Sequence, residues 1–188
     1  VCRTEKAEAV WQTVFDRAGE RGLKVIAWAH GFPGLVPEEF ISRWKSHPAL
    51  LAWMPIDEPE LYAKPEDVTR AFAHFQKLDP YHPVYMNNTV MGIPSHFAGL
   101  PGDIVSIDDY LTNRPNRKVA EMVKDIEMMN EVAIPSRRPV WMFLAGNNLY
   151  NHSREPTAGE QVAQTYGCVI AGASGIKYFL GDPISPKH

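Results

Sequence analysis

The stretch HPALLAWMPIDEPEL, from His47 to Leu61, decides how this chain is interpreted. Its apolar run LLAWMPI ends in two adjacent carboxylates, Asp57 and Glu58, and Pro59 follows them directly. The turn after a buried strand usually takes Asn, Asp, Gly or Pro, and glutamate is a poor helix cap. The pair is therefore either a solvated strand end beside a helix cap or a reactive site. Neither a turn nor a helix cap explains a glutamate at position 58. This favours the reactive site.

Composition limits the class of protein. The chain has 188 residues, of which 45% are hydrophobic, and a formal net charge of −3, which is typical of one globular domain over residues 1–188. No basic stripe is present, so we expect no nucleic-acid partner. No apolar run approaches the roughly 20 residues of a membrane span, so we expect no membrane insertion. No His or Cys spacing predicts a zinc site, and neither a metal nor a cofactor is expected.

Helical and strand patterns alternate along the whole chain. Apolar, β-branched runs predict strands over 23–31, 50–56, 84–88, 104–108, 139–145 and 175–180. Amphipathic spacing, first-turn prolines and a capping-box pattern predict helices over 5–21, from 37, and over 65–78, 117–132 and 157–173.

This alternation predicts an α/β fold with a parallel sheet, either a (β/α)₈ barrel or an open doubly wound sheet. The strands are continuous apolar runs, as expected for strands that are covered on both faces. No glycine-rich phosphate loop follows any strand, which weakens the nucleotide-binding open sheet. The barrel is therefore favoured over the open sheet without excluding it, and a (β/α)₈ TIM barrel with only these six βα units would be incomplete in this chain.

Polar or titratable residues follow every expected strand. In chain order they are His30, Asp57, Glu58, Asn87, Asn88, Asp108, Asp109, Tyr110, Asn147, Asn148 and Asp182. In a parallel barrel these ends converge on one face, where the active site lies. Taken singly, an Asp or Asn at such a place is better explained as a turn or cap residue. Taken together, they predict a ligand-binding mouth.

The stretch also resembles a known family. HPALLAWMPIDEPEL is similar to the fourth-strand region of (β/α)₈ glycoside hydrolases, in which an Asn/Asp-Glu-Pro pattern carries the acid/base glutamate. The later segments KLDPYHPVYMNN, DIVSIDDY, RRPVWMFLAG and REPTAGEQVAQTYGCVIAGASGIKYF resemble the passages to the fifth, sixth, seventh and eighth strands. The resemblance implies that the chain is an excerpt, from the third strand to the eighth. Further segments, or another chain, would then cover the open sheet edges.

The resemblance implies hydrolysis of O-glycosidic bonds in an oligo- or polysaccharide, with Glu58 as general acid/base and Asp57 contacting the sugar. It implies substrate contacts from His30, the asparagines, Tyr110 and Asp182. Because such barrels are often exported, an extracellular or periplasmic location is favoured, although the sequence leaves the compartment open.

One departure from the family leaves the mechanism open. Retaining relatives place a nucleophilic glutamate at the end of the seventh strand, but that region is WMFLAGNNLY here and has no acid. Asp108 or Asp109 is then the expected second carboxylate. Alternatively, Asp57 and Glu58 resemble the adjacent acids of substrate-assisted N-acetylhexosaminidases, which need no protein nucleophile. The third possibility is a barrel that binds carbohydrate without catalysing a reaction.

Overall fold

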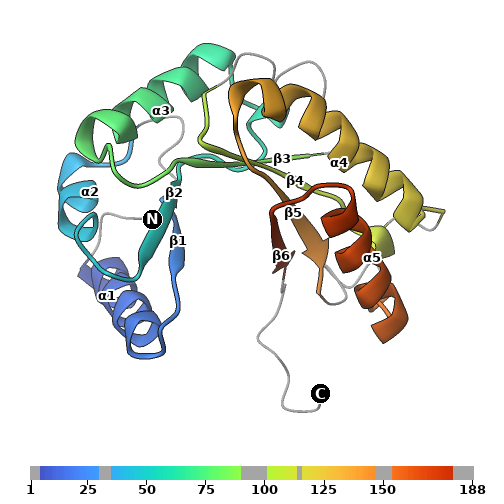
Figure 1. Ribbon diagram of the computed structural model, residues 1–188. Coiled ribbons are helices and arrows are strands. Elements are labelled where there is room, and N and C mark those ends of the chain that lie inside the picture. The colour runs from blue at the N-terminus through green and yellow to red at the C-terminus, as the bar shows by residue number, and fades with distance from the viewer. Residues whose placement is uncertain (1–4, 30–34, 90–100, 114–115, 147–153, 180–188) are drawn as a thin grey trace. The chain divides into compact units, whose positions relative to one another are not determined.

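The computed structural model describes residues 5–29, 35–89, 101–113, 116–146 and 154–179, over which helices and parallel strands alternate (Figure 1). Two compact units are present. The first comprises Val1–Asn87 and Gly99–Ile104, and the second comprises Asn88–Ala98 and Val105–His188. Each is described separately below. The α/β class predicted from the sequence is confirmed, whereas the single domain over 1–188 stays a prediction.

The first unit contains the first two strands and their helices. Its elements are α1 (Glu5–Glu20), β1 (Val25–Trp28), α2 (Glu38–Trp44), β2 (Leu50–Met54), the 3₁₀ turn η1 (Pro59–Leu61), α3 (Pro65–Leu78) and the start of β3 (Tyr85–Thr89). Strands β1 and β2 are parallel, and single bridges join the β2 segment to the β3 segment at Trp53–Val84 and Asp57–Asn87. Helix α1 ends at Glu20, and Gly22 in the following turn has a φ of 67°, which suits glycine.

An aromatic core holds the first unit together. Phe15, Trp44, Trp53 and Phe75 are all at least 98% buried. Phe15 stacks on Trp44 with ring centroids 4.9 Å apart, and Trp53 lies 5.3 Å from Phe75. Side chains from α1, α2, β2 and α3 therefore meet in one cluster, which fixes β2 against its helices.

One hydrogen bond of this core reaches a buried acid. The Trp53 indole Nε1 donates to Asp79 Oδ2 at 2.8 Å, just beyond the end of α3. Asp79 also lies 2.8 Å from His82 Nδ1 and is 2% exposed. Burial alone would raise the pKa of Asp79, but hydrogen bonds from Trp53 and His82 outweigh it and lower that pKa.

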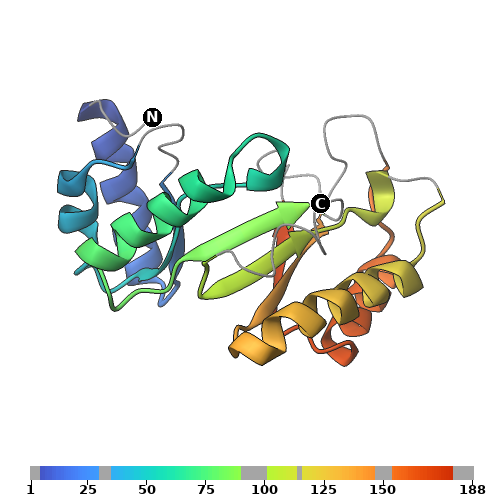
Figure 2. The same ribbon diagram turned by 90° about the horizontal axis from the view of Figure 1, so that it is seen from above.

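The second unit contains β4 (Ile104–Asp108), the 3₁₀ turn η3 (Leu111–Asn113), α4 (Val119–Ala133), the 3₁₀ turn η4 (Ile134–Ser136), β5 (Val140–Ala145), α5 (Ala158–Ile170) and β6 (Gly175–Phe179). The end of β3 joins these strands in a sheet with the order β3-β4-β5-β6. The β4–β5 and β5–β6 pairs are parallel. Helices α4 and α5 lie side by side (Figures 1 and 2).

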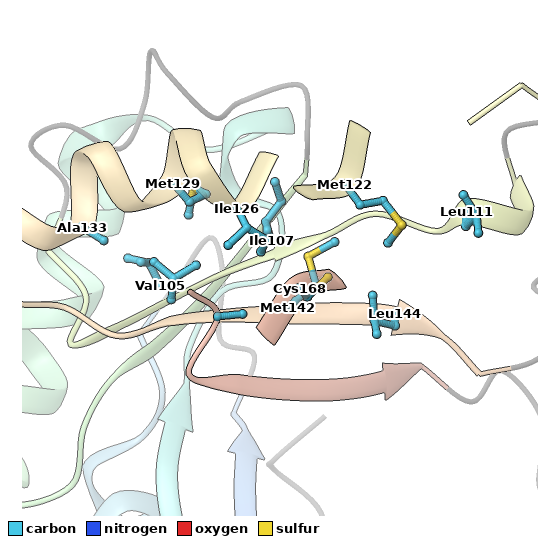
Figure 3. Packing of buried hydrophobic residues seen from close by; sticks show 12 residues of the cluster. Val105, Ile107, Leu111, Met122, Ile126, Met129, Ala133, Met142, Leu144 and Cys168 are labelled. Atoms are coloured by element: carbon cyan, nitrogen blue, oxygen red, sulfur yellow. The ribbon is translucent and has the colours of Figure 1, made fainter. Parts of the chain in front are cut away.

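Alternate strand residues of the second unit pack against its helices. Val105 and Ile107 of β4 and Met142 and Leu144 of β5 belong to one buried cluster with residues of α4 and with Cys168 of α5 (Figure 3). Because strand side chains alternate between faces, the intervening residues lie on the other face of the sheet. Within the described residues, no helix is long and apolar enough to cross a membrane.

Most predicted elements agree with the structure to within a few residues. The predicted strand 23–31 is shorter, Val25–Trp28, because Leu23 is largely exposed and precedes the ladder. The predicted strand 50–56 ends at Met54, and the helix predicted from 157 begins at Ala158, after the capping-box residue Thr157.

The Trp53–Asp79 bond generates a stability prediction. Trp53→Phe should lower the free energy of unfolding by about 1–3 kcal/mol more than Trp44→Phe does, because it removes a donor from a buried carboxylate. Trp44 is a matched control, since it is equally buried and its Nε1 has no hydrogen-bond partner among the described residues. Urea denaturation of both variants would measure the difference. Equal losses would show that the bond contributes nothing.

Candidate active site

Asp57 and Glu58, which follow the end of β2 at Met54, are hydrogen-bonded to β3. Asn87 Nδ2 donates to Asp57 Oδ1 at 3.0 Å, and the Glu58 N–H donates to the Asn87 carbonyl, also at 3.0 Å. The Asn87 amide oxygen accepts from the Tyr85 hydroxyl at 3.5 Å, which orients the amide. The structure therefore brings Asp57, Glu58 and Asn87 together, and β3 fixes the direction of the acid pair.

Glu58 has an unusual backbone. Its φ of 44° and ψ of 52° are left-handed, and among the described non-glycine residues only Arg137 shares a positive φ. Such a conformation costs on the order of 1–3 kcal/mol and persists where surrounding contacts enforce it. Here the bond to Asn87 and the following buried Pro59, which opens η1, provide that constraint. Strain of this kind concentrates at functional sites.

Tyr62 closes the turn that carries these acids. Its hydroxyl donates to the Asp57 carbonyl oxygen at 2.6 Å. Burial raises the pKa of Tyr62, and the negative charges of Asp57, Glu58 and Glu60 raise it further. The charges of three carboxylates therefore act on one phenol. The sequence analysis did not identify Tyr62, because a tyrosine four residues after a glutamate has no distinctive pattern.

In the second unit, Asp109 forms a buried ion pair. Arg117 Nε donates to Asp109 Oδ2 at 2.7 Å, and the same guanidinium donates to Asp125 of α4. Burial alone would lower the pKa of Arg117, but hydrogen bonding and the charge of Asp109, followed by the charge of Asp125, raise it. These contacts give Asp109 a structural role, and its catalytic role stays a prediction.

The remaining predicted residues of this unit lie at the ends of β3 and β4. Asp108 is 8% exposed and ends β4, on the sheet face opposite the helices. The Asn88 amide is fully buried and donates to the Ser106 carbonyl at 2.9 Å, which is a sheet contact. Tyr110 is partly exposed, with its ring centroid 5.8 Å from that of Phe179. His30, Asn147, Asn148 and Asp182 lie outside the described residues.

No metal site is found in the part of the chain that the structure describes, where no three His, Cys, Asp or Glu side chains gather suitably. The candidate reactive groups of the first unit are carboxylates. Asp57 is a fixed hydrogen-bond acceptor, and Glu58 is an acid held in one backbone conformation beside it.

Comparison with known proteins identifies the fold. No protein-family model and no curated protein sequence matches the chain. Among solved structures, the chain is similar to the endoglucanase Cel5A of Pseudomonas stutzeri, with a TM-score of 0.67 and 14% identity over 94% of this chain and 66% of that one. It is also similar to an active-site mutant of a Rhizomucor miehei β-1,3-glucanosyltransferase, solved in complex with laminaritriose. That TM-score is 0.63, with 9% identity over 92% and 70% of the two chains.

The likeness is one of fold. The neighbours are TIM-barrel proteins, so the predicted α/β barrel class is confirmed, and the fold resembles that of glycoside hydrolase catalytic domains. A 2,3-dimethylmalate lyase is similar as well, with a TM-score of 0.53 and 15% identity over 88% of this chain and 60% of that one. The chain spans about two thirds of the endoglucanase. Because one fold hosts many chemistries, activity has to be argued from the site.

The carboxylates around Tyr62 generate a titration prediction. Glu58→Gln should lower the pKa of Tyr62 toward its usual value of about 10, because it removes one negative charge near the phenol. The ultraviolet absorbance of tyrosinate would follow the titration, with the Tyr62→Phe spectrum subtracted to isolate this residue. Glu38→Gln, on the exposed side of α2, should leave the pKa unchanged. An unchanged pKa in Glu58→Gln would place the Glu58 carboxylate away from the phenol.

The Arg117 ion pair generates a stability prediction. Arg117→Met should lower the free energy of unfolding by about 3–5 kcal/mol, because Asp109 and Asp125 would remain buried without their cation. Arg154→Met removes an exposed pair with Glu160 and should leave the denaturation midpoint nearly unchanged. Equal midpoints for the two variants would contradict the structural role assigned to Arg117.

Proposed function

We propose that the chain is the catalytic barrel of a glycoside hydrolase, in which Glu58 acts as general acid/base on an O-glycosidic bond. The observation that carries the proposal is the geometry of Glu58. Glu58, four residues beyond the end of the apolar strand β2, is held in a left-handed conformation by a bond to β3 and by the following buried proline. Nothing in local secondary structure requires a glutamate at this position.

Asp57 has a positioning role in this proposal. Its Oδ1 accepts from Asn87, so the carboxylate has a fixed orientation and retains acceptor capacity for a sugar hydroxyl. Asn87 is 3% exposed, and its contacts are those of a residue that orients the acid pair. A carbohydrate is therefore the proposed partner, while Asn87 supports the site through Asp57.

The second carboxylate of a two-acid mechanism is proposed to be Asp108. Asp109 was the other candidate from the sequence, but its side chain is fully buried and bound to Arg117, so ion-pairing occupies it. The strand β5 continues into Ala145 and Gly146 without an acid, where retaining relatives carry a nucleophilic glutamate.

A second candidate function is substrate-assisted hydrolysis of N-acetylhexosaminides. The immobilised Asp57 beside Glu58 favours it, because that mechanism needs an acceptor that orients the acetamide group and an adjacent general acid. It needs no protein nucleophile, so the missing acid of β5 is not an obstacle. A strict requirement for a 2-acetamido group would select this mechanism.

The proposed function predicts a large loss of activity in Glu58→Gln. We expect hydrolysis of aryl glycosides or polysaccharides to fall by about 10²–10⁴-fold, as is typical when a general acid is removed. Glu66→Gln, in the exposed first turn of α3, is the matched control and should retain full activity. Release of reducing sugar or of the aryl alcohol would measure both variants.

The same series discriminates among the candidate functions. Asp108→Asn should also abolish turnover if two protein carboxylates act, and should leave it within a few-fold if the substrate assists. Activity of Glu58→Gln within a few-fold of the unmodified chain would overturn both hydrolase mechanisms. The remaining candidate would then be a barrel that binds carbohydrate without turnover.

A further inference from the structure

The peptide unit between Asp57 and Glu58 is hydrogen-bonded at both of its polar ends. Its N–H donates to the Asn87 carbonyl of β3 at 3.0 Å. Its carbonyl oxygen accepts from the Tyr62 hydroxyl at 2.6 Å. The next carbonyl along the chain, that of Glu58, accepts from the Leu61 N–H at 3.1 Å. The two peptide units that flank the Glu58 Cα atom therefore have fixed orientations, and these orientations define the φ and ψ of that residue.

Local preference opposes the conformation that results. The φ of 44° at Glu58 is left-handed, and a residue with a Cβ atom adopts such a φ only at a cost. The residue before a proline is also directed toward extended backbone, and Pro59 follows Glu58 directly. Both effects would move Glu58 to a negative φ if its flanking peptide units were released. The surrounding hydrogen bonds therefore have to maintain the left-handed backbone.

The Tyr62 hydroxyl directly opposes that movement. A rotation of φ at Glu58 to a negative value turns the peptide unit before it and carries the Asp57 carbonyl oxygen away from the hydroxyl. The net contribution of one hydrogen bond is of the same order as the strain of a left-handed residue. Loss of this single bond would therefore shift the backbone of Glu58 toward the extended conformation, even though the two main-chain bonds remain available.

The direction of the Glu58 side chain depends on this backbone. The Cα–Cβ bond changes its direction relative to β3 when φ and ψ change, so an extended Glu58 would point its carboxyl elsewhere. A general acid has to lie within hydrogen-bond reach of the oxygen that it protonates. A displacement of about 1 Å is enough to lower the rate greatly.

We propose that Tyr62 is a positioning residue for Glu58. Its hydroxyl holds the Asp57–Glu58 peptide unit, keeps Glu58 left-handed and thereby directs the Glu58 carboxyl toward the scissile glycosidic bond. Tyr62 acts through the backbone and needs no contact with the substrate. This inference rests on the proposed function, because it takes Glu58 to be the general acid.

A double-mutant cycle tests the backbone step without any turnover. At a left-handed position glycine is more stable than alanine, because glycine has no Cβ atom. Glu58→Gly should therefore have a folding equilibrium constant about fivefold higher than that of Glu58→Ala while Tyr62 is present. The advantage should disappear when each change is combined with Tyr62→Phe, because residue 58 can then become extended. Urea denaturation of the four chains would measure both ratios.

Tyr81→Phe is the matched control, because it removes the same hydroxyl from a side chain of the first unit that is 91% exposed. The advantage of glycine over alanine at position 58 should persist in that background. An advantage of equal size in the Tyr62→Phe background would overturn the proposal. The absence of any advantage while Tyr62 is present would overturn it as well.

The leaving group of the substrate tests the catalytic step. A dinitrophenyl glycoside needs little protonation of its leaving oxygen, whereas the phenyl glycoside of the same sugar depends on the general acid. Tyr62→Phe should lower kcat/KM for the phenyl glycoside about tenfold and leave that for the dinitrophenyl glycoside nearly unchanged. A purely structural loss would lower both values by the same factor. Tyr81→Phe should change neither value.

The positioning role and the proposed function fail separately. If Glu58→Gln abolishes hydrolysis of the phenyl glycoside but Tyr62→Phe affects both glycosides equally, the hydrolase stands and the positioning role is rejected. If Glu58→Gln hydrolyses as fast as the unmodified chain, the hydrolase is rejected, and the stability cycle alone decides whether Tyr62 holds residue 58 in its left-handed conformation.

Discussion

The fold of the first unit depends on the packing and the hydrogen bond of one tryptophan, Trp53. Trp53 is fully buried between Phe40 and Phe75, and its indole donates to Asp79 beyond the end of α3. The ring gives β2 its place in the apolar core, and the hydrogen bond fixes the ring's orientation. Asp57 and Glu58 follow only a few residues later, so the position of the acid pair is set by the packing of a side chain that does no chemistry.

Hydrogen bonds also fix the segment that follows β2. Asn87 holds Asp57 through its side chain and Glu58 through its carbonyl, while Tyr62 bonds back to Asp57. A preorganised carboxylate needs such support, because a displacement of about 1 Å at a catalytic group greatly lowers the reaction rate. The left-handed backbone at Glu58 is the local strain that these contacts maintain.

Sequence patterns predicted those features that depend on residues close together in the chain. The apolar runs located the strands, and the capping box at Thr157 located the start of α5. Glu58 stood out because glutamate after such a strand has no turn or capping explanation. Those arguments need only near neighbours in the chain, so they did not depend on knowing the tertiary structure.

Contacts between distant residues could not be predicted in this way. Arg117 is eight residues from both Asp109 and Asp125, and no sequence period marks a buried ion pair at that spacing. Asp109 therefore looked equivalent to Asp108, although Asp108 ends β4 on the face away from the helices and Asp109, just beyond the strand, is bound to Arg117.

The burial of Cys168 allows chemical labelling to report on opening of the second unit's core. The thiol is fully buried beneath α4, and burial, followed by the charges of Asp109 and Asp125, raises its pKa to about 12. At neutral pH it is neither ionised nor reachable, and a thiol reagent needs both conditions. The rate at which such a reagent labels Cys168 therefore reports how often the α4–α5 layer opens, which makes this cysteine a probe of local unfolding.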